Sequence, residues 1–343
     1  MKNRFICCAV SVALSALTFV SCGSPKKVLY LYNWTYYTPD TVIAQFEQEF
    51  GVDVIIDEYD SNEKMFAQLK AGASAYDIVV PSQDYVSIMI HENMLAKIDR
   101  EKFTNADKIN PAILAKAGYD SAMEYSVPYY VGAAGIAVNT AKVQSYEKSW
   151  DIFSRQDLRD HMSMLDDMRE VIGDALKFSG NSVNTLDGEQ LNEAKTRILT
   201  EWKPNLVKFD AEGYGKSFAS QDFWVVQGYS EAVFGEIDAQ DAKNVDFFIP
   251  VEGGPMYLDS LCILKNAKHY DEAMEFINFI HRPEIYAQFL DTFLFQPAVN
   301  PAAAEFMTTT PRYSSEDLER CELKNDLGRD LPLYEAIWQE IRY

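Results

Sequence analysis

The 343-residue sequence has few of the residue patterns that carry covalent, metal or cofactor chemistry. No His-Glu-x-x-His motif, Cys-x-x-Cys pair, Gly-x-Ser-x-Gly elbow or phosphate-binding P-loop is present. Gly213-Tyr214-Gly215 lacks the third glycine of a dinucleotide fingerprint. The histidines are scattered along the chain, at His91, His161, His269 and His281. The sequence therefore predicts a binding protein that is not an enzyme and that uses neither a metal nor a cofactor.

The apolar run at the N-terminus, from Phe5 to Val20, is shorter than the roughly 20 residues of a comfortable membrane span. Lys2 and Arg4 precede this run and the small residue Ser21 follows it, which is the pattern of an export signal. We therefore expect residues 1–21 to be removed as a signal peptide.

The end of this run, Phe19-Val20-Ser21-Cys22, resembles a bacterial lipobox, with Phe19 where leucine is usual. In such a motif the cysteine becomes the lipidated first residue of the mature protein. We expect an exported, periplasmic lipoprotein held at the membrane by a lipid on Cys22, with residues 22–27 as a polar tether. Ordinary cleavage nearby, without a lipid, is the alternative.

Cysteine is scarce in the expected mature chain. Of the five cysteines, Cys7 and Cys8 leave with the signal peptide and Cys22 would carry the lipid. The remaining two, Cys262 and Cys321, permit at most one disulfide. Cys262 lies in an apolar run at 261–264, so we expect it to be a small buried hydrophobe.

Positive charge is in deficit, since 31 Lys and Arg stand against 52 Asp and Glu, for a formal net charge of -21. Loss of Lys2 and Arg4 with the signal peptide would change this charge from -21 to -23. Such acidity repels nucleic acid and anionic lipid headgroups, and it attracts cationic solutes. The mature chain is also too long for one ordinary core and suits two lobes.

The first part of the mature chain alternates between strand and helix patterns. The expected elements are a strand at 28–32, a helix capped by Thr38 and ended by Gly51, a strand at 52–56, a helix capped by Asn62 and a strand at 77–80. Strands separated by single helices predict a parallel sheet. The loops after the three strands hold Trp34, Tyr59 and Ser82, and they should meet at the carboxyl edge of the sheet, where such folds bind ligands.

Aromatic residues gather in the first of these loops, at 33–39. We interpret the loop as facing a ligand; the alternative is that Trp34 and Tyr37 only fill the top of the core. Two other segments, 127–139 and 245–251, are extended in pattern and suit crossings between lobes. Apolar residues again recur at helical spacing at 272–280, which predicts a helix there.

Acidic residues gather at two further places. The run 166–170 begins a helix and includes Asp167 and Glu170, although carboxylates in a first turn are also favoured by the helix dipole alone. Asp259 lies between the Gly253-Gly254 turn and a buried strand, where an unpaired charge is costly. Aromatic walls with unpaired carboxylates suit a flexible organic polycation, because rings pack against methylenes and ammonium groups, and carboxylates accept charged hydrogen bonds.

At these residues the chain resembles the spermidine and putrescine receptors of bacterial polyamine ABC transporters, the PotD and PotF type. The resemblance spans nearly the whole mature chain. Its specific pieces are Asn33-Trp34-Thr35, Asp77-Ile78-Val79-Val80-Pro81-Ser82, Asp166-Asp167-Met168-Arg169-Glu170-Val171, Glu252-Gly253-Gly254 and Asp259-Ser260-Leu261, with Lys324-Asn325-Asp326-Leu327-Gly328 as a weaker match.

The resemblance implies an α/β, periplasmic-binding-protein-like fold whose two lobes are joined by crossing hinge segments and close on a polyamine. The expected lobes are 28–132 plus 258–299, and 133–257 plus 300–343. The implied function is to bind putrescine or spermidine and deliver it to the membrane permease of an ABC importer.

The resemblance also implies the pocket residues. Those carried over are Trp34, Thr35, Tyr37 and Ser82 in the first lobe, Asp167, Glu170 and Tyr229 in the second lobe, and Tyr257, Asp259 and Phe295. Tyr229 and Tyr257 stand where the family usually has tryptophan.

Three departures from the family pattern bear on the choice between a diamine and a triamine. Tyr36 replaces an acid, Asp84 stands where an aromatic is usual, and Lys324 stands where a glutamine is found. We expect Asp84 to supply the charge lost at Tyr36; the alternative is that it caps the following helix. Lys324 either pairs with Asp167 or Glu170 in the pocket or is a solvated lysine of the tail.

Rival functions remain open from the sequence. A receptor for another small cationic solute, or a surface adhesin on the same fold, would share most of these features. A glycosidase would need two carboxylates that flank a bond. Asp167 and Glu170 are one helical turn apart on one face and do not meet that requirement.

Overall fold

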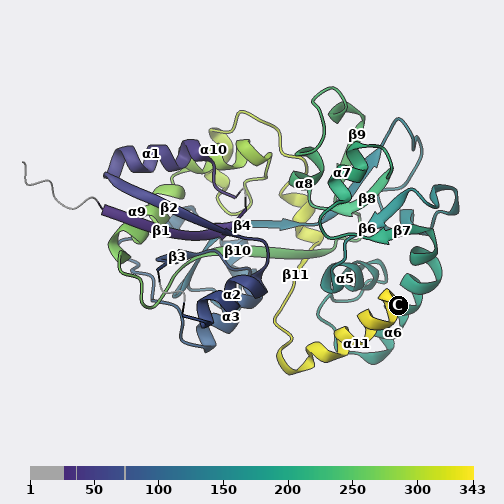
Figure 1. The fold of residues 1–343 in the computed structure, drawn as a ribbon, viewed down its shortest axis with the longest axis horizontal. Coiled ribbons are helices and arrows are strands. Elements are labelled where there is room, and N and C mark those ends of the chain that lie inside the picture. The colour runs from purple at the N-terminus through teal and green to yellow at the C-terminus, as the bar shows by residue number, and fades with distance from the viewer. Residues whose placement is uncertain (1–26, 36, 73–74) are drawn as a thin grey trace, which may run out of the picture.

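The computed structural model describes residues 27–35, 37–72 and 75–343, and it has two α/β lobes side by side (Figure 1). The expected signal peptide, Cys22 and Tyr36 lie outside the described residues. Within the described part, no helix combines the length and apolarity needed to cross a bilayer. The predicted two-lobed α/β fold is confirmed.

The first lobe is built on a six-stranded sheet in the order β11-β10-β3-β1-β2, with β4 paired to β10. Its strands are β1 (Lys27–Trp34), β2 (Val52–Tyr59), β3 (Ile78–Val79), β4 (Ser126–Ala133), β10 (Pro255–Ile263) and β11 (Glu322–Leu323). The β1–β2 and β1–β3 pairs are parallel, as the alternating pattern predicted. β10 runs antiparallel to β3 and β4.

Helices cover both faces of this sheet. They are α1 (Asp40–Phe50), α2 (Asn62–Lys70), α3 (Gln83–His91), α4 (Pro111–Lys116), α9 (Tyr270–Ile280) and α10 (Pro283–Phe293). Alternation along β1 sends Leu29 and Leu31 into the core beneath α1, α9 and α10, and Tyr32 into the core beneath α2 and α3 (Figure 1). The carboxyl ends of β1 and β3 therefore emerge between these two layers.

The ends of two helices differ by one residue from the sequence prediction. α1 has Pro39 at its N-cap position, while the Thr38 hydroxyl accepts a hydrogen bond from Asn33 Nδ2 at 2.8 Å. Gly51 ends α1 as predicted, with φ of 65°. α2 begins at Asn62, but its cap is Ser61, whose hydroxyl accepts from the Lys64 amide.

The second lobe has a five-stranded sheet in the order β7-β6-β8-β5-β9. Its strands are β5 (Gly135–Asn139), β6 (Met162–Met164), β7 (Leu206–Phe209), β8 (Val225–Gly228) and β9 (Val245–Phe248). Its helices are α5 (Met168–Phe178), α6 (Gly188–Arg197), α7 (Tyr214–Ala219), α8 (Ser230–Phe234) and α11 (Leu331–Arg342). α5 follows directly after β6, so its N-terminus lies at the carboxyl end of that strand.

Three chain segments cross between the lobes. β4 pairs in the first sheet and β5, after Ala134, pairs in the second. The chain returns from β9 to β10, and it crosses a third time from β11 to α11, which packs on α5 and α6 (Figure 1). The first crossing lies in the predicted segment 127–139, and the second, at 249–254, begins in the predicted segment 245–251 and ends beyond it. The third passes through Lys324.

The last boundary between the two lobes lies later in the chain than the expected residue 300. The short helix Pro301–Glu305 packs on α10 of the first lobe, and β11 pairs with β10. β10 itself begins in the first sheet at Pro255, three residues before the expected start at 258. The residues after β11 are therefore the part of this C-terminal segment that joins the second lobe.

Candidate functional site

The loop after β1 lies at the edge of the first sheet, as expected. Trp34 is half-buried, its Nε1 donates to the Val80 carbonyl at 2.9 Å, and its ring lies 4.7 Å from that of Tyr59. The Thr35 amide donates to the Tyr59 carbonyl at 3.2 Å, and its side chain is exposed. These contacts hold the three strand ends together.

Tyr37 lies deeper than Trp34, in an aromatic cluster with Tyr129 and Tyr130. Its hydroxyl donates to Asp259 Oδ2 at 2.8 Å. Phe295 is 1% exposed and stacks on Tyr130 with ring centres 3.9 Å apart. The structure therefore places Phe295 behind Tyr37 and Tyr130, as packing beneath the wall.

Asp259, on β10, is a buried acid held between Ser82 and Tyr37. It is 4% exposed, and it accepts hydrogen bonds from the Ser82 hydroxyl at 2.6 Å and from Tyr37. The β4–β10 register shifts between Asp259 and Ser260, and on its other side Asp259 forms an isolated bridge with Ser82. Burial raises the pKa of Asp259 to about 6, and the two hydroxyl donors only partly oppose this shift. Asp259 forms no ion pair with a described residue.

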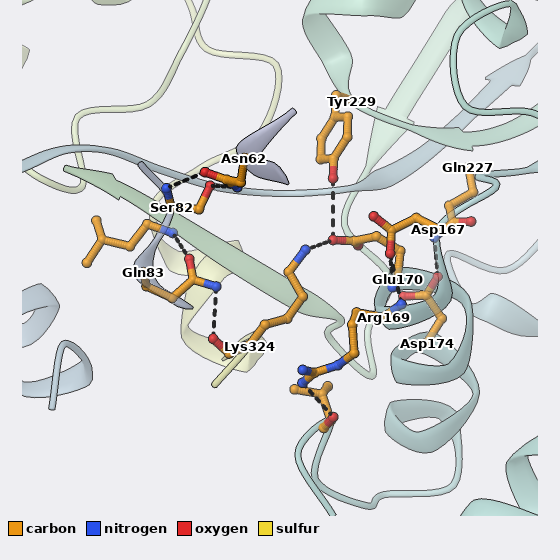
Figure 2. A network of polar contacts seen from close by, with 12 residues as sticks. Asn62, Ser82, Gln83, Asp167, Arg169, Glu170, Asp174, Gln227, Tyr229 and Lys324 are labelled. Atoms are coloured by element: carbon orange, nitrogen blue, oxygen red, sulfur yellow. Dashed lines mark hydrogen bonds and ion pairs between the residues drawn. The ribbon is translucent and has the colours of Figure 1, made fainter. Parts of the chain in front are cut away.

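The start of α3 supplies the next group of polar side chains. Ser82 is at the N-cap position, but its hydroxyl is used on Asp259, and Asn62 binds the Ser82 amide at 3.2 Å. Gln83 accepts from the Leu258 amide at 2.9 Å and donates to the Lys324 carbonyl at 2.8 Å (Figure 2). Gln83 thereby ties β10, α3 and the third crossing segment together.

Asp84 follows in the first turn of α3 and is not the cap of this helix, so the capping alternative is wrong. Burial raises the pKa of its carboxyl, and the charges of Lys324 and Arg169 oppose that shift. Asp84 therefore lies in the field of two cations that belong to the crossing segment and to the second lobe.

The second lobe presents the beginning of α5 to this group. Asp167 is its N-cap, and its Oδ1 accepts from the Arg169 amide at 2.8 Å and the Glu170 amide at 3.0 Å (Figure 2). Glu170 is fully buried. Its Oε1 pairs with Lys324 Nζ and accepts from the Tyr229 hydroxyl at 3.4 Å, while its Oε2 has no hydrogen-bond partner among the described residues.

Lys324 is a buried member of the site, so the alternative of a solvated tail lysine is wrong. Its side chain is 15% exposed and points from the crossing segment to Glu170 (Figure 2). Burial lowers the pKa of Lys324, but the negative charges of Glu170, Asp167 and Asp84 outweigh it and raise the pKa above the ordinary lysine value. Burial raises the pKa of Glu170, and Lys324 opposes that shift.

The two predicted wall tyrosines meet across the lobes. The Tyr229 and Tyr257 rings are 5.7 Å apart at 84°, an edge-to-face contact. Tyr257 lies opposite Gly132 in the β4–β10 register, and a Cβ at Gly132 would come within 2.6 Å of the Tyr257 hydroxyl. A glycine at 132 therefore makes room for the tyrosine ring in the wall.

Two acids near this wall escaped the sequence interpretation. Glu231 is half-buried in the first turn of α8, and burial raises its pKa to about 7. Asp174 is fully buried one turn after Glu170, with its Oδ2 hydrogen-bonded to Gln227, and burial raises its pKa well above the ordinary value (Figure 2). Two features of the sequence could have indicated these acids. Glu231 is two residues after Tyr229, and Asp174 is four residues, or about one helical turn, after Glu170.

The arrangement suits the binding of a cation and offers no site for a metal. In the described part of the chain, no three His, Cys, Asp or Glu side chains gather closely enough to hold a metal ion. Cys262 and Cys321 are both free and buried. What remains is a set of buried carboxylates and tyrosine rings from both lobes, with Lys324 as the cation that lies among them.

Comparison with known proteins agrees with this geometry. The family model for bacterial extracellular solute-binding proteins matches residues 41–316. The chain is 34% identical over 325 residues to the spermidine/putrescine-binding periplasmic protein of Escherichia coli, with 92% of each chain covered. It is 29% identical over 329 residues to the putrescine-binding protein PotF of that organism, covering 91% of this chain and 88% of PotF.

Solved structures agree as well. The TpPotD lipoprotein of Treponema pallidum superposes with a TM-score of 0.89 at 52% identity, covering 92% of this chain and 99% of that one. PotD from Streptococcus pneumoniae superposes with a TM-score of 0.84 at 25% identity, covering 92% of this chain and 100% of that one. The chain therefore belongs to the bacterial extracellular solute-binding proteins, within their spermidine/putrescine-binding PotD family.

Proposed function

We propose that this protein is the substrate-binding component of a polyamine ABC importer and that it binds putrescine or spermidine between its lobes. The observation that carries the proposal is Asp259, a carboxylate that is 4% exposed and has hydroxyl partners but forms no ion pair with a described residue; the charge of Lys324 acts on it only from a distance. Leaving a buried charge without a counter-charge is costly. A ligand ammonium supplies that counter-charge.

The surroundings of Asp259 suit a polyamine better than an inorganic cation. Tyr229 and Tyr257 form an edge-to-face pair beside it, and Trp34 is half-buried at the rim. Methylenes pack on such rings, while ammonium groups lie over ring faces or on carboxylates. We assign ligand contacts to Trp34, Thr35, Tyr37, Ser82, Asp84, Asp167, Glu170, Tyr229, Tyr257 and Asp259, with Phe295 supporting the wall and Glu231 as an added acid.

Cellular placement is part of the proposal. The Escherichia coli relatives are periplasmic proteins, and TpPotD is a lipoprotein. The lipobox-like sequence that ends at Cys22 supports lipidation there, and residues 22–27 would tether the domain to the membrane near its permease. Labelling with a palmitate analogue, compared between the natural sequence and Cys22→Ser, tests the anchor; equal labelling of both would refute it.

Ligand class is tested by thermal shift. Putrescine, cadaverine, spermidine and spermine are compared with neutral amino acids, sugars and single-charge amines, each at about 100 times the expected dissociation constant. Binding at that ratio stabilises the native state by about 2.7 kcal/mol. We expect a rise in melting temperature with polyamines alone. A shift with another solute class and none with polyamines would overturn the proposal, and no shift with any solute would favour the adhesin alternative.

A further inference from the structure

Lys324 brings an ammonium group into the site from a fixed position on the backbone. Its amide donates to the Met256 carbonyl at 3.1 Å, which continues the pairing of β11 with β10. Its carbonyl accepts from Gln83 Nε2 at 2.8 Å. Because both backbone groups are held by the first lobe, the side chain starts from a defined point and extends toward the second lobe (Figure 2).

The ammonium ends on a group that a ligand would otherwise use. Lys324 Nζ pairs with Oε1 of Glu170, a carboxylate with no exposed surface. Asp167 at the start of α5, Asp84 on α3 and Asp259 on β10 are other acids that interact with this ammonium, and Arg169 is a second cation near Asp84. The guanidinium of Arg169 donates to the Asn325 and Val183 carbonyls and to the Asn184 side chain. In Figure 2 it points away from the Glu170 carboxylate.

We propose that the Lys324 side chain is a built-in substitute for one ammonium of the ligand, so that the site binds a diamine in preference to a triamine. This inference rests on the proposed function. With Glu170 paired from within the chain, one carboxylate of the site is already occupied, whereas Asp259 has no ion-pair partner among the described residues and feels the charge of Lys324 only from a distance. A diamine places one ammonium at Asp259 and supplies the counter-charge that this carboxylate lacks.

A triamine meets a different situation. Its third ammonium must lie beside Lys324 or displace it from Glu170. The first arrangement places two like charges in a buried region, and the second leaves the lysine buried without its partner. Both arrangements weaken the triamine relative to the diamine, so Lys324 acts as a residue that sets ligand length and charge.

The test measures dissociation constants of putrescine and spermidine by calorimetry for the natural protein, Lys324→Gln and Lys324→Gln/Glu170→Gln. We expect the natural protein to bind putrescine at least as tightly as spermidine. Lys324→Gln frees Glu170 for a third ammonium, and the ratio of affinities should move toward spermidine by at least tenfold. The double variant also lacks the Glu170 carboxylate that Lys324→Gln sets free, so its ratio should return to within threefold of the natural value.

Lys208→Gln is the matched control, because it removes an exposed lysine that pairs with Asp210 at 2.7 Å in the second lobe and should leave both affinities unchanged. Circular dichroism and melting temperature establish that each variant is folded. If Lys324→Gln does not fold, a natural protein that prefers spermidine over putrescine by tenfold is enough to refute the inference. Polyamine binding with a ratio unmoved by Lys324→Gln also refutes it while leaving the proposed function intact. Absence of polyamine binding by the natural protein would instead refute both.

Discussion

Substitution of Asp259 by asparagine should make the ligand-free protein more stable while it weakens polyamine binding. Burial raises the pKa of Asp259 from 3.8 to about 6. A folded-state pKa above the unfolded value means that the native state binds more protons between these two pH values. Its stability therefore falls as pH rises from 3.8 through 6. Two pKa units correspond to about 3 kcal/mol, which is the upper limit of this loss.

Asparagine carries no charge at any pH, so Asp259→Asn should not suffer this loss. Its shape fits between Ser82 and Tyr37, whose hydroxyls can donate or accept. Above pH 7 we expect the variant to unfold several degrees higher than the natural protein in the absence of ligand, and at pH 4 the two should converge. Affinity for polyamine should fall at least tenfold, or about 1.4 kcal/mol.

Differential scanning calorimetry at pH 4 and 7.5, with titration calorimetry at pH 7.5, measures both effects. Asp77→Asn is the matched control, because Asp77 is also buried but is satisfied by the amides of Tyr30, Lys268 and His269. Removing that charge should lower stability by about 1–3 kcal/mol and leave polyamine affinity unchanged. If Asp259→Asn instead lowers stability at pH 7.5 and binds polyamine normally, Asp259 is structural and the reasoning fails.

Further predictions concern pH, packing, charge and shape. Polyamine affinity should be constant above pH 7 and fall by up to tenfold per pH unit below pH 6, where Asp259 takes up a proton. A dissociation constant at pH 5 equal to that at pH 7.5 would contradict this pH dependence. Gly132→Ala should displace the Tyr257 ring, lower stability by about 1–3 kcal/mol and weaken binding, as melting and titration calorimetry would show. Glu231→Gln should weaken binding severalfold in the same titration; equal affinity would place Glu231 outside the site. Small-angle scattering should give a larger radius of gyration without polyamine than with it. The reason is that a ligand reaches the buried Asp259 only when the lobes separate. Equal radii would argue against a hinge.

Much of the fold could be predicted because local signals and the hydrophobic pattern agree along the first lobe. The alternation of strands and helices up to β3 sets parallel pairing, and parallel pairing places the Trp34, Tyr59 and Ser82 loops at one edge. Helix ends were less exact, since Pro39 and Ser61 are each one residue away from the predicted caps. The third crossing was missed because β11 has two residues and no periodicity to recognise.

Recognition in this site depends on contacts that sequence patterns do not encode. Lys324 and Glu170 are 154 residues apart, and only the pairing of β11 with β10 shows that the lysine reaches α5. The choice between a buried and a solvated lysine therefore required the third crossing to be known. Phe295 likewise looks like a wall residue in the sequence, but the stack on Tyr130 places it beneath the wall.

The same contacts explain why the number of acids in the sequence does not by itself determine the ligand. Asp167 is partly satisfied by the amides at the start of α5, Glu170 by Lys324, and Asp174 by Gln227. Among the described residues, Asp259 accepts hydrogen bonds from two hydroxyls, which stabilise a carboxylate less than a cation in contact does. A buried carboxylate whose charge is incompletely compensated destabilises the ligand-free protein. A ligand ammonium that supplies the missing counter-charge removes this cost, and the free energy recovered contributes to binding. We infer that affinity is concentrated at Asp259, whereas selectivity between polyamines is set at Glu170 by the lysine that already occupies it.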